Sequence, residues 1–73
     1  MNNQQNVSFA DFITLVEAFG FIRKRVNGSH HIYKCPGITD MVNIQNKNGM
    51  AKAYQVKQFL SIVERYNLQV NEE

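Results

Sequence analysis

A change of hydrophobic period at Gly20 constrains the fold of this 73-residue chain more than any other feature. Ser8 and Asp11 form a capping-box pattern, in which a hydroxyl and a carboxylate serve the first amides of a helix. Gly20 suits the left-handed position just past a helix end. The sequence therefore predicts a helix from about residue 9 to 19. Its apolar residues recur at helical spacing and should face the core: Phe9, Phe12, Ile13, Val16 and Phe19.

After Gly20, short strand-forming runs replace the helical spacing. We predict strands at 21–26, 30–34 and 40–45, and in the last of them Val42 and Ile44 alternate with Met41, Asn43 and Gln45. The first two are joined by a type I′ turn with Asn27 and Gly28 at its centre, because both central positions of that turn need a positive φ. Pro36-Gly37 ends the second strand, and residues 46–49 read as a polar loop.

The last element returns to helical spacing, with its apolar residues predicted to face inward: Val56, Phe59, Leu60, Val63 and Tyr66. The order helix, three antiparallel strands, helix predicts a two-layer α+β domain. Both helices should cover one face of the sheet and leave the other face open. We expect a single domain at residues 8–70, with a flexible N-terminal tail at 1–7 and a C-terminal tail at 71–73.

The composition favours a cytoplasmic protein. No apolar run approaches the roughly 20 residues that cross a bilayer. The Asn- and Gln-rich start lacks the basic and apolar regions of a secretory signal. Cys35 is the only cysteine, so no disulfide can form within the chain, which fits a reducing compartment.

The net charge of +2 is unevenly distributed along the chain. Residues 21–53 hold six basic side chains and one acidic side chain, a net charge of +5. The rest of the chain holds two basic and five acidic side chains, a net charge of −3. A basic block of this kind suits a polyanion, because phosphate contacts supply most sequence-independent affinity for nucleic acids. A solvated basic face is the alternative interpretation.

The predicted hairpin carries Gly28-Ser29-His30-His31 inside this basic block. Side chains alternate along a strand, so His30 and His31 should point to opposite faces, and at most one shares the basic surface. A histidine serves as general acid or base near neutral pH, and nearby cations stabilise charge on a phosphate under attack. This is a minimal inventory for RNA cleavage through the 2′-hydroxyl. A non-catalytic phosphate site and a histidine bonded to a neighbouring carbonyl are the alternatives.

Other chemistries fit these residues less well. A histidine pair with one cysteine lacks the ligands of a structural zinc site, so we expect no metal and no cofactor. Cys35 lies beside Pro36-Gly37, without a helix N-terminus to activate its thiol as a nucleophile. Tyr33 could stack on a base, but a strand tyrosine more often fills the edge of a core.

Several motifs resemble the HicA family of mRNA interferase toxins over about residues 11–68: Gly20-Phe21, Arg25, the run from Gly28 to Lys34, and Pro36-Gly37. The resemblance implies a double-stranded-RNA-binding-domain-like fold. It also implies a metal-independent endoribonuclease that cleaves mRNA and blocks translation. The expected partner is a HicB-type antitoxin, bound in a hetero-oligomer. The family's catalytic histidine directly follows Gly-Ser, which is His30 here, and His31 has no established role.

Six residues are candidate RNA or phosphate contacts: Arg23, Arg25, Gly28, Ser29, Lys34 and Lys47. The sequence departs from the family at one segment, because many members follow the third strand with Pro-His where this chain has residues 45–48, Gln-Asn-Lys-Asn. A non-catalytic RNA-binding module on the same fold is one alternative function. A protein-interaction domain with an acidic partner is another.

Overall fold

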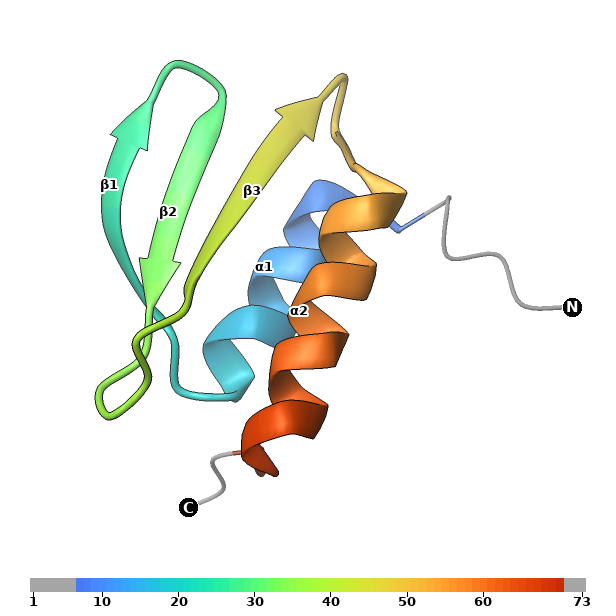
Figure 1. Ribbon diagram of the computed structural model, residues 1–73. Helices are drawn as coiled ribbons and strands as arrows, with labels where there is room; N and C mark the ends of the chain where they lie inside the picture. Colours follow the sequence, from blue (N-terminus) through green and yellow to red (C-terminus); the bar gives the residue numbers. More distant parts are fainter. Residues whose placement is uncertain (1–6, 71–73) are drawn as a thin grey trace, which may run out of the picture.

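The computed structural model describes residues 7–70. Its elements follow the order α1 (Phe9–Ala18), β1 (Ile22–Asn27), β2 (His30–Lys34), β3 (Met41–Lys47), β4 (Met50–Ala51) and α2 (Ala53–Tyr66). The described strands form one antiparallel sheet in the order β1-β2-β3-β4, and both helices lie on the same side of it (Figure 1). The predicted two-layer α+β fold, double-stranded-RNA-binding-domain-like, is thereby confirmed.

Two details at the borders of the fold extend the prediction. The prediction of a loop at residues 46–49 is wrong in its first half, because Asn46 and Lys47 belong to β3 and pair with a short strand, β4, that the sequence did not predict. The expected tails lie outside the described residues, apart from Val7. The carbonyl of Val7 accepts a hydrogen bond of 3.0 Å from the backbone N–H of Ala51 in β4.

Helix α1 begins and ends where its sequence pattern predicts. The Ser8 hydroxyl accepts a 3.0 Å hydrogen bond from the backbone N–H of Asp11. Gly20 follows the helix with a φ of +93° and donates its N–H to the carbonyl of Glu17. Phe12 and Val16 are buried against the sheet, which anchors α1 through its predicted apolar stripe.

Phe59 of α2 lies at the centre of the aromatic core. Its ring meets those of Phe12, Phe19 and Phe21 edge-on, with centroid distances of 5.8, 5.6 and 5.4 Å. Such edge-to-face contacts are favourable because the positive edge of one ring meets the negative face of another. The two helices and the residue that leads into β1 therefore share one aromatic cluster.

The inward face of α2 differs from the predicted one. Ile62 is buried, whereas Leu60 and Tyr66 are 38% and 37% exposed, so placing these two in the core was wrong. Leu60 falls outside the buried face of the helix, and Tyr66 is the last residue of α2, at the end of that face. The buried face of Phe59 and Ile62 also contains Gln55, a polar residue that is only 3% exposed. The side-chain oxygen of Gln55 accepts a 2.8 Å hydrogen bond from the backbone N–H of Gln45, which replaces the hydrogen bond to water that the buried amide loses.

The Asn-Gly turn with two positive φ values forms at residues 48–49 and not at residues 27–28, where the sequence predicts it. Asn27 pairs with His30, so the β1–β2 loop consists of Gly28 and Ser29, and the predicted turn centred on Asn27-Gly28 is wrong by one residue. Of these two loop residues only Gly28 has a positive φ, +64°, which is the pattern of a type II′ turn with glycine first. Asn48 and Gly49, with φ of +53° and +84°, form the turn between β3 and β4.

Candidate functional site

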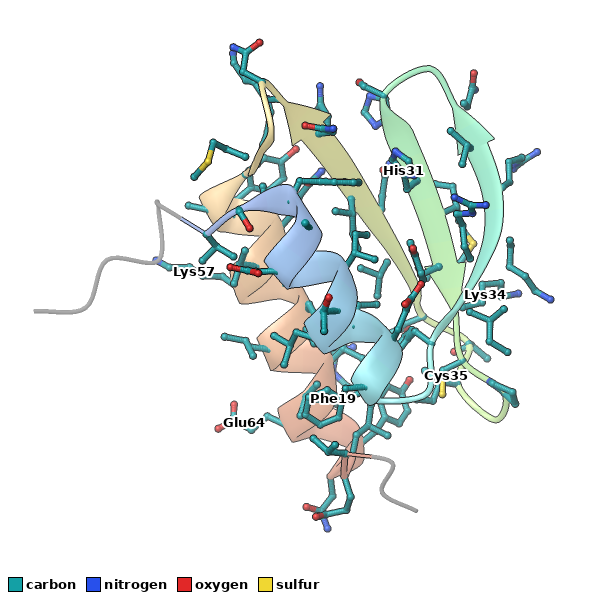
Figure 2. The ribbon with its side chains drawn as sticks, turned by 180° about the vertical axis from the view of Figure 1, so that it is seen from behind. Phe19, His31, Lys34, Cys35, Lys57 and Glu64 are labelled. Atoms are coloured by element: carbon teal, nitrogen blue, oxygen red, sulfur yellow. The ribbon has the colours of Figure 1, made fainter. Side chains whose placement is uncertain are left out.

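The two histidines of β2 lie on opposite faces of the sheet, as strand alternation predicts. His31 pairs with the buried Ile44, and cross-strand partners share a face, so His31 points toward the helices. Its ring contacts that of Phe9 in α1, with centroids 4.8 Å apart. Figure 2 shows His31 near the turn end of β2 and Lys34 toward the other end. His31 is therefore a packing residue of the helix-covered face.

His30 points to the open face of the sheet, where it meets a side chain of β3. Its Nδ1 atom lies 3.2 Å from Oδ1 of Asn43. An amide oxygen can only accept a hydrogen bond, so this contact requires a hydrogen on Nδ1. In the neutral ring, the lone pair of Nε2 is then available to another partner. The partner of His30 is thus a side-chain amide, not the backbone carbonyl that one interpretation of the sequence expected.

Arg25 and Lys34 lie on the same open face as His30. Arg25 pairs with Ile32, which is two residues along β2 from His30, and Lys34 is four residues along. At about 3.3 Å of rise per residue, the Lys34 backbone is roughly 13 Å from that of His30. Arg25 is therefore the nearer of these two cations, and Lys34 reaches a position farther along the face.

Arg23 lies on the other side of the sheet. A β-bulge shifts the β1–β2 register between Arg23 and Arg25, with Lys24 at the bulge. Arg23 consequently pairs with the buried Tyr33 and faces the helices. An extra residue in one strand changes which side chains share a face. The structure therefore does not bring Arg23 together with His30.

Tyr33 belongs to the core and not to the open face. It is only 2% exposed, and its hydroxyl donates a 3.3 Å hydrogen bond to the carboxylate of Glu17 in α1. Burial raises the pKa of Tyr33, and the negative charge of Glu17 raises it further, while Arg23 opposes the rise. This contact joins β2 to α1 and excludes a base-stacking role for Tyr33 in the folded protein.

Gly28, Ser29 and Lys47 lie at the end of the sheet that carries His30. The backbone N–H of Asn46 donates a 3.1 Å hydrogen bond to the carbonyl of Ser29, which ties the β1–β2 turn to the end of β3. Gly28 is exposed, and no atom lies within 4 Å of the position a Cβ would take. A ligand backbone can therefore approach the turn closely.

Within residues 7–70, no group of three or more His, Cys, Asp and Glu side chains is placed to hold a metal ion. Cys35 is half-buried with a free thiol. In that same part of the chain, no helix has the length and apolar character needed to cross a membrane.

A family model described as the HicA toxin of bacterial toxin-antitoxin matches residues 9–64, from the start of α1 to near the end of α2. The match covers well over half of the chain. The chain belongs to the HicA toxin family. No curated protein and no solved structure matches the chain. As a HicA protein it is the toxin of a toxin–antitoxin system, and an antitoxin is its implied partner.

In this HicA chain the departing segment, residues 45–48, forms the end of β3 and the first residue of the β3–β4 turn. The N–H of Gln45 donates to Gln55, and the side-chain oxygen of Asn46 accepts a 2.8 Å hydrogen bond from the N–H of Gly49. A proline at position 45 has no N–H and could not serve the buried Gln55. The residues that replace Pro-His here therefore have a structural role at the β3–β4 turn.

Sequence reasoning missed Asn43 as a partner of His30. Alternation along β3 had already placed Asn43 on the outward face, opposite Val42 and Ile44. Alternation within one strand does not give the β2–β3 register, which pairs His30 with Gln45 and Ile32 with Asn43. Asn43 is thus a diagonal neighbour of His30, close enough for side chains to meet.

Proposed function

We propose that this HicA toxin is a metal-independent endoribonuclease that cleaves mRNA, with His30 as its catalytic residue. The observation that carries the proposal is the contact of 3.2 Å between His30 Nδ1 and Asn43 Oδ1 on the open face. This contact orients the imidazole and leaves Nε2 able to accept a proton, as a general base requires. Arg25 on the same face supplies positive charge near the ring.

The reaction uses the 2′-hydroxyl of the RNA as its nucleophile. Nε2 of His30 accepts the 2′-hydroxyl proton while the 2′-oxygen forms a bond to the adjacent phosphorus. The bond from phosphorus to the 5′-oxygen then breaks, and the imidazolium returns its proton to that oxygen. The products are a 2′,3′-cyclic phosphate and a 5′-hydroxyl. Arg25 stabilises the negative charge that gathers on the phosphate oxygens in the transition state.

The remaining candidates have binding roles in this proposal. Lys34 and Lys47 hold phosphates on either side of the cleaved bond, and the Gly28-Ser29 turn allows the RNA backbone to approach His30. Arg23 is left out of the phosphate set, because it faces the helices.

The antitoxin in this proposal is a HicB-type protein that forms a hetero-oligomer with the toxin. Binding over the open face would cover His30 and exclude RNA. A toxin that cleaves mRNA and is held by such a partner acts in the cytoplasm.

Expression of the toxin without its antitoxin tests this proposal. The wild-type protein should arrest growth and fragment mRNA on a gel of total RNA, and His30→Ala should do neither while keeping the wild-type circular dichroism spectrum. Arrest of equal strength with His30→Ala would contradict the catalytic assignment. Arrest with intact RNA would instead favour a non-catalytic RNA-binding module, or an interaction protein if the purified chain binds no RNA.

A further inference from the structure

A shallow hollow of about 670 Å³ lies where β3 and β4 meet the start of α2. Its lining includes Lys47, Met50, Lys52 and Tyr54, with no acidic residue among the described residues that line it. Tyr54 is 58% exposed, although a tyrosine ring is large and mostly apolar. The hollow thus combines two ammonium groups with an exposed aromatic ring.

The hollow continues the open face beyond His30. His30 pairs with Gln45, and Lys47 follows two residues later on the same face of β3, roughly 7 Å farther along the strand. Lys47 in turn pairs with Met50 of β4, from which the chain leads directly into α2. A polymer that crosses His30 toward this edge of the sheet therefore enters the hollow at Lys47.

The chemistry of the hollow matches one unpaired nucleotide and its phosphates. Ammonium groups bind phosphate oxygens, and exposed aromatic rings stack on bases whatever their sequence. A pocket of a few hundred cubic ångströms suits a ligand of this size. A base can offer its face to a protein ring only when it has left a duplex.

We propose that this hollow binds an unpaired nucleotide of the RNA substrate, with its base against Tyr54 and the flanking phosphates on Lys47 and Lys52. The proposal rests on the function proposed above and specifies its substrate, which is single-stranded RNA next to the cleaved bond. An acidic protein surface would also satisfy the two lysines. The exposed ring and the continuity with the row of His30 favour RNA.

The test is a binding measurement on proteins that carry His30→Ala, so that the RNA stays intact. The probes are a fluorescent single-stranded oligoribonucleotide and a duplex of the same sequence. Tyr54→Ala should weaken single-strand binding roughly 5- to 150-fold, and Tyr54→Phe should keep the wild-type affinity, because the ring still stacks. Tyr66→Ala, at the far end of α2, is the matched control and should change nothing.

The lysines add a second expected result. The logarithm of the affinity falls as the logarithm of the salt concentration rises. Lys47→Gln and Lys52→Gln should each make this fall less steep by about 0.7 for the single strand, as expected for one lost phosphate contact. Unchanged salt slopes in both variants would show that neither lysine contacts a phosphate of the RNA.

Three results for Tyr54→Ala would overturn the proposal. The variant could keep its affinity for single-stranded RNA, it could lose as much affinity for the duplex as for the single strand, or it could lose affinity for the antitoxin but not for RNA. The third would assign the hollow to the protein partner. These failures are distinct from failure of the proposed nuclease activity, because binding is measured without cleavage. A nuclease that depends on His30 but not on Tyr54 would keep the proposed function and refute only the nucleotide site.

Discussion

The Nδ1 atom of His30 and the Oδ1 atom of Asn43 lie 3.2 Å apart, on adjacent strands of the open face. Both side chains belong to the sheet and not to a loop, so their relative positions are set by the β2–β3 register. A hydrogen bond to one ring nitrogen selects the tautomer of a histidine and so determines what the other nitrogen can do. In this toxin a neutral His30 that donates from Nδ1 to Asn43 keeps the lone pair of Nε2, which the proposed function uses as the proton acceptor.

Asn43→Ala should therefore lower the rate of RNA cleavage roughly tenfold while leaving RNA affinity unchanged, which corresponds to the loss of about one hydrogen bond in the transition state. Asn43→Asp keeps an acceptor oxygen and should retain the Nδ1–H tautomer. Nitrogen NMR of the imidazole reads this tautomer without any need for activity. Gln58→Ala, an exposed amide on α2, is the control. An Nε2–H tautomer of His30 in the wild-type protein would refute the positioning role of Asn43.

Gln55→Ala should destabilise the fold by about 1–3 kcal/mol, because the N–H of Gln45 would lose its acceptor in a half-buried position. Gln58→Ala on the same helix is exposed and should change the free energy of unfolding by less than about 0.5 kcal/mol. Urea unfolding of both variants measures the difference. Equal stabilities would show that the buried amide contributes nothing to the fold.

The raised pKa of Tyr33 makes the stability of the protein depend on pH in the alkaline range. The unfolded tyrosine titrates near pH 10, and the folded one holds its proton to higher pH. Its contribution to stability is therefore complete below about pH 10 and is lost as the pH rises through the folded pKa.

Tyr33→Phe should reduce this loss of unfolding free energy above pH 10, and should cost about 1 kcal/mol at pH 7 through the missing bond to Glu17. Urea unfolding at pH 7 and at several values above pH 9 measures both effects. If Tyr33→Phe loses stability with pH as steeply as the wild type, burial of the hydroxyl is not the cause.

Local patterns predicted much of this structure because their causes are local. The bond from Asp11 to Ser8 and the left-handed Gly20 both follow from residues within one helical turn of each other. Alternation in β3 likewise placed Val42 and Ile44 inward. The opposite orientations of His30 and His31 needed only the period of a strand.

The rest depended on contacts between distant segments. The bulge between Arg23 and Arg25, which removes Arg23 from the open face, cannot be recognised from the sequence of β1. The inward face of α2 includes the polar Gln55, whose burial is explained by its hydrogen bond with Gln45, ten residues earlier in the chain. The contact of His30 with Asn43 needed the pairing of two strands, and strand register is set by the whole sheet.

The most direct test of the central claim is cleavage of a single-stranded RNA by the purified toxin. The wild-type protein should release fragments that end in a 2′,3′-cyclic phosphate, in the presence of a metal chelator. One 2′-deoxynucleotide at the cleaved position should block the reaction there, because the nucleophile is missing. His30→Ala should bind the same RNA and leave it intact. Cleavage at an undiminished rate by His30→Ala, or of the 2′-deoxy substrate by the wild type, would contradict the account.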